Sequence, residues 1–162
     1  MDFTPIALLL VMLLAANGAP VLAWRLLGER CAAPVDGGRT AWDGRPLLGR
    51  SKTWRGLLAS LLATPPVAML LGLDWHTGLL VAVGAMAGDL LSSFLKRRLG
   101  IEPSGQALGL DQVPESLLPA LLTAPVLHTG ALDWLLVVVL FTVGELLLSR
   151  ILYRLHLRKR PY

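Results

Sequence analysis

Apolar and polar positions alternate along this chain in long blocks. Five blocks are almost wholly apolar, and they cover residues 6–27, 56–73, 78–95, 114–127 and 134–152. A helix rises about 1.5 Å per residue, so most of these blocks are long enough to cross the roughly 30 Å hydrocarbon core of a bilayer. The pattern predicts an all-α integral membrane protein with about five transmembrane helices.

The first and fourth blocks each leave an alternative open. The first block lacks the positively charged start of a signal peptide, because its charge follows the apolar run. Asn17 and Pro20 interrupt this block, because the Asn17 amide needs a hydrogen-bond partner and proline breaks helices. A simple kink in the helix is the alternative. The fourth block is short and carries Glu115 and Pro119 near its start, so a tilted or partly re-entrant segment is an alternative to a full crossing.

The segments after the second and fourth blocks are short. Residues 74–77 and 128–133 are expected to form tight turns on one side of the membrane, the first with an interfacial tryptophan. His76 is expected to be a solvated turn residue, since no second His or Cys stands at metal-site spacing. Glu145 lies inside the fifth block and is expected to face the bundle in a hydrogen bond.

Composition supports a membrane protein. The 162 residues are 54% hydrophobic and 16% charged, and the mean hydropathy is +0.62. A soluble domain of this length needs a larger polar surface. The single cysteine excludes an internal disulfide framework. We expect one membrane domain over residues 1–162, with polar loops at about 28–55 and 97–113.

The positions of the positive charges predict the topology. Seven of the 15 Lys and Arg residues lie within residues 25–55, three within 96–98 and five within 150–160. By the positive-inside rule, the N-terminus lies outside, and the C-terminus and both polar loops lie in the cytoplasm. This is the arrangement of a multi-pass protein of the cell (inner) membrane. Nucleic acid is not an expected partner, because the charges flank apolar segments instead of covering a soluble face.

Candidate chemistry is concentrated in residues 88–112. If residues 79–98 are helical, the polar side chains fall on one face, at i, i+3, i+4, i+7 and i+8: Asp89, Ser92, Ser93, Lys96 and Arg97. An aspartate after a long apolar run is costly at membrane depth and usually faces a bundle interior, an ion or a water-filled cavity. Asp89 is therefore a functional candidate, and pairing with a snorkelling Lys or Arg is the alternative.

The first polar loop suits phosphate binding. Asp36 and Asp43 each precede glycine in turn signals, and residues 49–53 place glycine, hydroxyls and cations directly before the next helix. Free N–H groups at a helix start favour anions. The spacing is not that of a Walker loop, and a loop that is basic only to fix topology is the alternative.

Together these loops suit phosphoryl or nucleotidyl transfer. Cations hold phosphates, while carboxylates hold Mg²⁺, which binds one or two of them together with substrate phosphates. Among the residues of the sequence, no Ser, His and Asp triad and no Cys/His cluster stands out. An enzyme of this class mainly positions groups and neutralises charge.

The motifs resemble the CDP-archaeol synthase family, CTP-dependent cytidylyltransferases of ether-lipid synthesis. They are more distantly similar to phosphatidate cytidylyltransferase. The resemblance covers residues 17 to about 118 and is carried by Asp36-Gly-Gly, Asp43-Gly-Arg, the 48–56 segment, Gly88-Asp89 through Arg98, and Leu110-Asp111-Gln112. Two departures are the missing His-Gly-Gly in residues 104–110 and Val113-Pro114-Glu115 in place of an acidic-aromatic continuation.

The resemblance implies that CTP and Mg²⁺ bind on the cytoplasmic side, and that a lipid phosphate attacks the α-phosphorus and releases pyrophosphate. By position, Asp89 and Asp111 would hold the metal and would form the catalytic set with Lys96. The substrate-binding set would comprise Asn17, Asp36, Asp43, Lys52, Thr53, Ser92, Ser93 and Arg97. The lipid can be an archaeal ether phosphate or a phosphatidate-like ester, and the oligomeric state and the number of metal ions stay open.

A small transporter or scaffold is the alternative from another functional class. An ion path through buried acidic residues would account for Asp89 and Glu145. It would not account for the grouping of Asp36, Lys52 and Asp111 in loops on one side.

Overall fold

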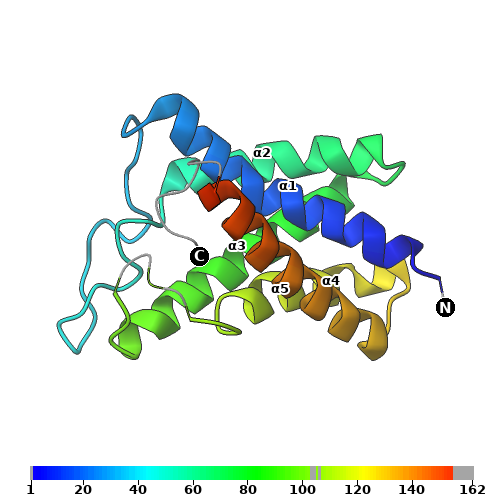
Figure 1. Cartoon of the computed structure of the whole chain (residues 1–162). Coiled ribbons are helices and arrows are strands. Elements are labelled where there is room, and N and C mark those ends of the chain that lie inside the picture. Colours follow the sequence, from blue (N-terminus) through cyan, green and yellow to red (C-terminus); the bar gives the residue numbers. More distant parts are fainter. Residues whose placement is uncertain (1, 103–104, 106, 155–162) are drawn as a thin grey trace.

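The computed structural model describes residues 2–102, 105 and 107–154, and within these ranges it contains five α-helices. They are α1 (Thr4–Leu27), α2 (Trp54–Leu70), α3 (Trp75–Arg98), α4 (Gln112–Leu127) and α5 (Ala131–Arg154), shown in Figure 1. Each helix coincides with one of the apolar blocks. The predicted all-α fold is confirmed.

The helices differ in their ability to span a bilayer. In the part of the chain that the structure describes, three are long and apolar enough to cross: α1, α3 and residues 131–151 of α5. The other two, α2 and α4, have 17 and 16 residues, and at about 1.5 Å per residue each is shorter than the hydrocarbon core. For these two helices, a full crossing stays a prediction.

Two details of the sequence interpretation were wrong. Trp75, His76 and Thr77, expected in a turn, form the first turn of α3 after Asp74 as the N-cap residue. Residues 131–133, also expected in a turn, begin α5. Aspartate is common at the N-cap position, and Asp74 occupies it here although its side chain makes no capping hydrogen bond. The prolines inside α1, α2 and α4 leave these helices continuous.

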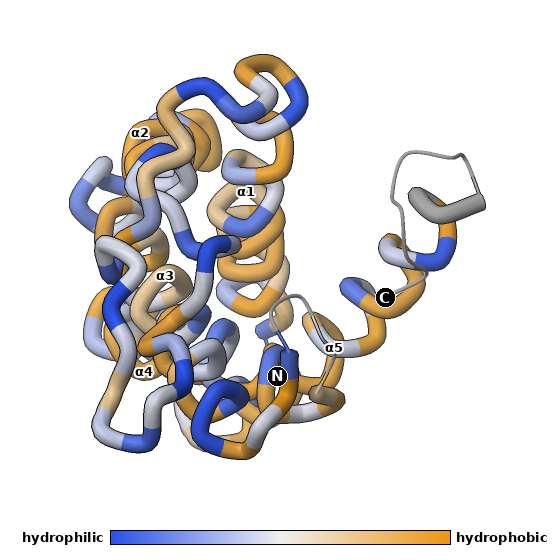
Figure 2. The backbone as a smooth tube through the Cα atoms, turned by 90° about the vertical axis from the view of Figure 1, so that its left-hand side faces the viewer, coloured by the Kyte–Doolittle hydropathy of each residue, from blue (hydrophilic) through white to orange (hydrophobic). Residues whose placement is uncertain are grey.

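Helix α3 is the centre of the bundle and α5 is its periphery. Helix α3 packs against α1, α2 and α4, and it makes its most extensive contact with α4. Helix α5 packs on α4 and α1. Seen from the loop end of the molecule, its C-terminal part diverges from the other four helices (Figure 2). Side chains on α3 therefore have neighbours on several helices.

Two glycines bring α3 and α4 into backbone contact. A Cβ atom at Gly84 would lie 2.8 Å from the Cα and N atoms of Pro119, and a Cβ at Gly88 would overlap the carbonyl of Pro114. Small residues four positions apart on a helix allow this close approach in membrane proteins. The contact at Gly88 lies directly beside Asp89.

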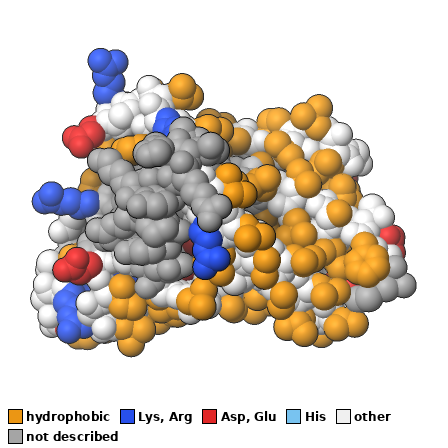
Figure 3. Space-filling view, viewed as in Figure 1, with side chains coloured by type: hydrophobic (Ala, Val, Ile, Leu, Met, Phe, Trp, Pro, Cys, Tyr) orange, Lys and Arg blue, Asp and Glu red, His pale blue; other side chains and the backbone are white. Residues whose placement is uncertain are grey.

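The bundle has an apolar half and a polar half. The apolar core joins the N-terminal parts of α1, α3 and α5 to the C-terminal parts of α2 and α4. The buried charged side chains Lys96, Arg97 and Glu115 lie at the opposite end together with Ser92 and Gln112, where the two long loops lie (Figure 1). On the face shown in Figure 3, charged side chains are concentrated at this loop end and apolar ones cover the helices. The fold places the candidate chemistry at one end of the bundle.

Candidate active site

The centre of the site is an ion pair between Lys52 and Asp89. The ammonium Nζ of Lys52 donates to Oδ1 and Oδ2 of Asp89 at 2.5 and 2.6 Å. Both side chains are mostly buried, with 20% and 22% of their surface exposed. The structure brings these two predicted residues together across 37 positions of sequence.

Backbone pairing of two short segments fixes the position of Lys52. The N–H of Val35 donates to the carbonyl of Lys52 at 2.8 Å, and the N–H of Trp54 donates to the carbonyl of Ala33 at 3.0 Å. Thr53 caps α2 by accepting a hydrogen bond from Gly56 at its hydroxyl. The hydroxyl of this predicted substrate-binding residue therefore stabilises the helix start next to Lys52.

A second ion pair joins Lys96 to Asp111. Their charged atoms lie 2.6 Å apart, and the two side chains are 10% and 16% exposed. Lys96 also donates to the carbonyl of Gly105, and the N–H of Ala107 donates to Asp111. This pair fastens the second loop to the C-terminal part of α3.

Ser92, Ser93 and Arg97, the other predicted residues on this face of α3, are buried. The hydroxyl of Ser92 donates to the carbonyl of Gly88 at 2.8 Å and lies 3.4 Å from the carbonyl of Asp111. Arg97 donates to the carbonyl of Glu102, while its Nε has no hydrogen-bond partner among the described residues. The predicted polar face of α3 is turned into the protein.

Asp36 organises the first loop. Its carboxylate accepts hydrogen bonds from the N–H groups of Gly38, Leu48 and Gly49 at 2.9 to 3.0 Å. Burial opposes ionisation, but these three donors outweigh it and hold the pKa of Asp36 below its ordinary value of 3.8. Gly49 adopts a φ of 98° at this turn, which favours glycine. Asp36 therefore stabilises the backbone conformation of the first loop.

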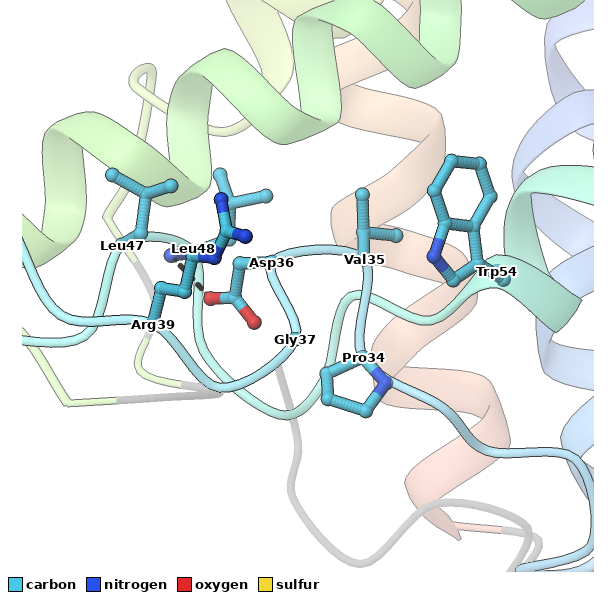
Figure 4. Close-up of a pocket in the computed structure, with 8 residues that line it drawn as sticks. All are labelled: Pro34, Val35, Asp36, Gly37, Arg39, Leu47, Leu48 and Trp54. Atoms are coloured by element: carbon cyan, nitrogen blue, oxygen red, sulfur yellow. Dashed lines mark hydrogen bonds between the residues drawn. The ribbon is translucent and has the colours of Figure 1, made fainter.

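The same loop and the start of α2 line an open pocket of about 470 Å³. Figure 4 shows Leu47, Leu48 and Arg39 gathered beside Asp36, with Trp54 at the opposite side. Most of the lining is apolar, and the backbone pairing described above connects it to Lys52. Sequence reasoning missed this pocket, because its walls come from segments that are separated in sequence and are brought together only by the folding of the loop.

Asp43 belongs to a group of contacts that join the first loop to the C-terminal end of α3. It accepts a hydrogen bond from Arg98 at 2.5 Å, and the Arg98 guanidinium lies over the rings of Trp42 and Phe94. Arg45 donates to the carbonyl of Arg98 at 2.7 Å. These contacts satisfy carbonyl groups at the helix end. The motif residue Asp43 thus fixes the loop to α3.

Asn17 lies in α1, and its Nδ2 atom is buried with no hydrogen-bond partner among the described residues. An amide without a partner is costly inside a membrane. Substrate binding by Asn17 stays a prediction.

Sequence reasoning gave Glu115 no place in the site, whereas the structure puts it beside Asp89. The side chains of Asp89 and Glu115 lie within hydrogen-bonding distance of each other. Glu115 is 9% exposed and lies in the first turn of α4. Like Asp89, Glu115 is a carboxylate at the border of an apolar segment, and this is the sequence signal that could have identified it.

No three His, Cys, Asp or Glu side chains come close enough to form a metal site on their own within the described ranges. A Mg²⁺ ion bound with a nucleotide needs only one or two carboxylates, because phosphates and water complete its shell. Asp89 and Asp111 supply such hard oxygen donors, and each already faces a cation. The donor chemistry of the site fits Mg²⁺.

Three comparisons with known proteins give one consistent result. A protein-family model described as CarS-like, CDP-archaeol synthase, matches residues 68–162. A CDP-archaeol synthase of Hyperthermus butylicus is 41% identical over 118 residues, which are 68% of this chain and 67% of that protein. One of Thermococcus kodakarensis is 38% identical over 140 residues, 76% of each chain.

A solved structure is also similar. It is described as an intramembrane enzyme for archaeal membrane lipids biosynthesis, is 32% identical in sequence and superposes with a TM-score of 0.76. The match covers 88% of this chain and 90% of that one. The arrangement of the helices therefore agrees with an enzyme that works within the membrane.

Proposed function

The chain belongs to the CDP-archaeol synthase family, and on that premise we propose that the loop end of α3 is its catalytic centre. The reaction is CTP-dependent cytidylyl transfer to archaetidic acid, which gives CDP-archaeol. Family membership favours an enzyme over the alternative of a transporter or scaffold. The observation that carries the assignment of the site is the pair of lysine–carboxylate contacts, Lys52 with Asp89 and Lys96 with Asp111.

The chemistry requires charge neutralisation. An oxygen of the lipid phosphate forms a bond to the α-phosphorus of CTP, and the bond from that phosphorus to the pyrophosphate breaks. Enzymes of this kind mainly hold phosphates in line and neutralise the charge that develops. The buried cations at the loop end, Lys52, Lys96 and Arg97, are suited to hold the phosphates.

Each lysine has a role before and after substrate binding. Without a ligand, Lys52 and Lys96 neutralise carboxylates that would otherwise be buried and charged. We propose that both ammonium groups turn to the phosphates when CTP binds, which leaves the carboxylates free to hold a cation. Asp89 and Asp111 would then hold Mg²⁺, which when bound neutralises charge on the phosphates of the nucleotide.

The other predicted residues support this centre in different ways. Asp36 and Asp43 shape the first loop and fasten it to α3. The hydroxyls of Thr53 and Ser92 hydrogen-bond within the protein, so we propose that they position Lys52 and the turn after Asp89. The available amide of Asn17 would donate to the substrate from the membrane side.

We propose that the site faces the cytoplasm. The two long loops and the C-terminal end of α5 lie toward the same end of the bundle (Figure 1). The Lys and Arg residues lie in the first loop, in the helix ends that adjoin the two loops, or in the C-terminal segment from residue 150 onward. The positive-inside rule places such segments in the cytoplasm. CTP can reach the site from that compartment.

The test is a reconstituted reaction. Purified protein is incubated with labelled CTP and Mg²⁺, with archaetidic acid, phosphatidic acid or no lipid phosphate, and CDP-lipid and pyrophosphate are measured. We expect equal amounts of CDP-archaeol and pyrophosphate with archaetidic acid, and no turnover without a lipid phosphate. Folded protein that forms no CDP-lipid from either acceptor would refute the proposal.

A further inference from the structure

Glu115, at the start of α4, is an acidic neighbour of Asp89. The carboxylate of Asp111, the other predicted metal ligand, contacts Lys96, whereas the side chain of Glu115 reaches Asp89 itself. The two acids come from different helices and are separated by 26 positions of sequence. Their contact is a property of the fold, which the local sequence pattern does not show.

The backbone enforces this proximity. Helix α4 buries one face against its neighbours, formed by Gln112, Glu115, Ser116, Pro119, Ala120, Thr123 and Leu127. A Cβ atom at Gly88 would lie 2.7 Å from the N atom of Glu115, so the start of α4 rests directly on α3 at this point. Because Asp89 follows Gly88, the two carboxyl groups are held side by side by a contact that only glycine permits.

The local charge can be balanced by a proton or by a further cation. Two ionised carboxylates at hydrogen-bonding distance repel each other unless a cation or a proton lies between them. One ammonium, that of Lys52, contacts Asp89, so the group of two acids and one lysine has a net charge of −1 when all three are ionised. If Lys52 turns to a phosphate, the deficit of positive charge grows.

We propose that Glu115 is a carboxylate of the divalent-cation site and holds Mg²⁺ together with Asp89. This inference rests on the proposed function, because it concerns the cation that accompanies CTP. Two carboxylates from rigid helices, with the remaining positions filled by phosphate and water, form a suitable set of donors for Mg²⁺.

The experiment measures CTP binding in the absence of a lipid acceptor, so that no turnover is needed. CTP affinity is followed by calorimetry over a Mg²⁺ titration for the native protein, Glu115→Gln and Glu102→Gln. Glu102 is an exposed acid of the second loop and is the matched control. We expect Glu115→Gln to raise the Mg²⁺ concentration at half effect by about tenfold or more, while Glu102→Gln leaves it unchanged.

A second variant keeps the test informative if Glu115→Gln does not fold. Glu115→Asp retains the charge on a shorter side chain, and we expect it to show a smaller shift in the same direction. An unchanged Mg²⁺ dependence in a folded Glu115→Gln or Glu115→Asp protein would overturn the inference, even if CTP binding were weaker overall. If the native protein formed CDP-archaeol normally in that case, the proposed function would stand and only the role of Glu115 would fall.

Discussion

Replacing Gly88 with alanine tests whether the contact between α3 and α4 sets the geometry of the site. The added Cβ would overlap the backbone of Pro114 and Glu115. Backbone atoms cannot rotate away as a flexible side chain can, so the helices must separate locally. The substitution inserts no charge and removes no hydrogen-bonding group.

The expected magnitude follows from two opposing effects. Forcing a methyl group into a packed interior costs about 1–3 kcal/mol, while alanine in place of glycine favours the helix by up to about 1 kcal/mol. The net loss of stability is small enough for the protein to remain folded. A displacement of about 1 Å at a reacting group can lower the rate about 100-fold, so we expect activity to fall far more than stability.

The assay is CDP-archaeol formation, measured beside thermal unfolding in detergent. Gly144→Ala on α5, where a Cβ atom meets nothing within 4 Å, is the control and should keep native activity. Gly84→Ala strains the same helix pair one turn deeper and should lose less activity than Gly88→Ala. Native turnover in Gly88→Ala would refute the reasoning that this contact positions Asp89.

Three further predictions concern phosphate binding, topology and the first loop. Lys52→Ala and Lys96→Ala should each lower turnover about 10- to 100-fold in an inserted protein, because one charge-assisted hydrogen bond to a phosphate is worth about 1.5–3 kcal/mol; native kinetics would mean that the lysines serve topology alone. The exposed native Cys31 should react with an impermeant thiol reagent only after the cells are permeabilised. The variant Trp75→Cys in a cysteine-free background should react in intact cells. Labelling of Cys31 in intact cells would contradict the predicted topology. The pKa of Asp36 is lowered, so its hydrogen bonds stabilise the loop above pH about 4, and this stabilisation is lost as the pH falls through the folded pKa. Asp36→Asn should therefore raise the hydrogen-exchange rates of the loop amides at neutral pH. Unchanged exchange rates would contradict this role.

The sequence predicted the five helices because each is a block of apolar residues. An apolar block indicates which residues are buried in lipid or in a core. It therefore predicts the position of a helix well, but not its ends, because polar residues can belong to the first and last turns. The start of α3 shows this, since Trp75 and His76 read as a polar turn although they lie within the helix. Crossing of the membrane by α2 and α4 is less well determined, because their lengths of 17 and 16 residues are marginal.

The candidate site was only partly predictable, for a physical reason. Helical periodicity places Ser92 and Lys96 on the same face as Asp89, because they lie on one element. Contacts between elements depend on packing, so neither the pairing of Lys52 with Asp89 nor the position of Glu115 could be derived from spacing. Asp36 shows a further limit, since a turn aspartate looks the same in sequence whether it binds substrate or backbone N–H groups.

The central claim is that Asp89 at the loop end of α3 belongs to the catalytic centre, and the substitution Asp89→Asn tests it most directly. Asparagine keeps the shape of the side chain and removes its charge. Cytidylyl transfer from CTP to archaetidic acid is measured over a range of Mg²⁺ concentrations, with membrane insertion checked in parallel. We predict an inserted protein whose activity falls by about 100-fold or more and whose residual activity requires higher Mg²⁺. Near-normal transfer with an unchanged Mg²⁺ dependence would contradict the claim.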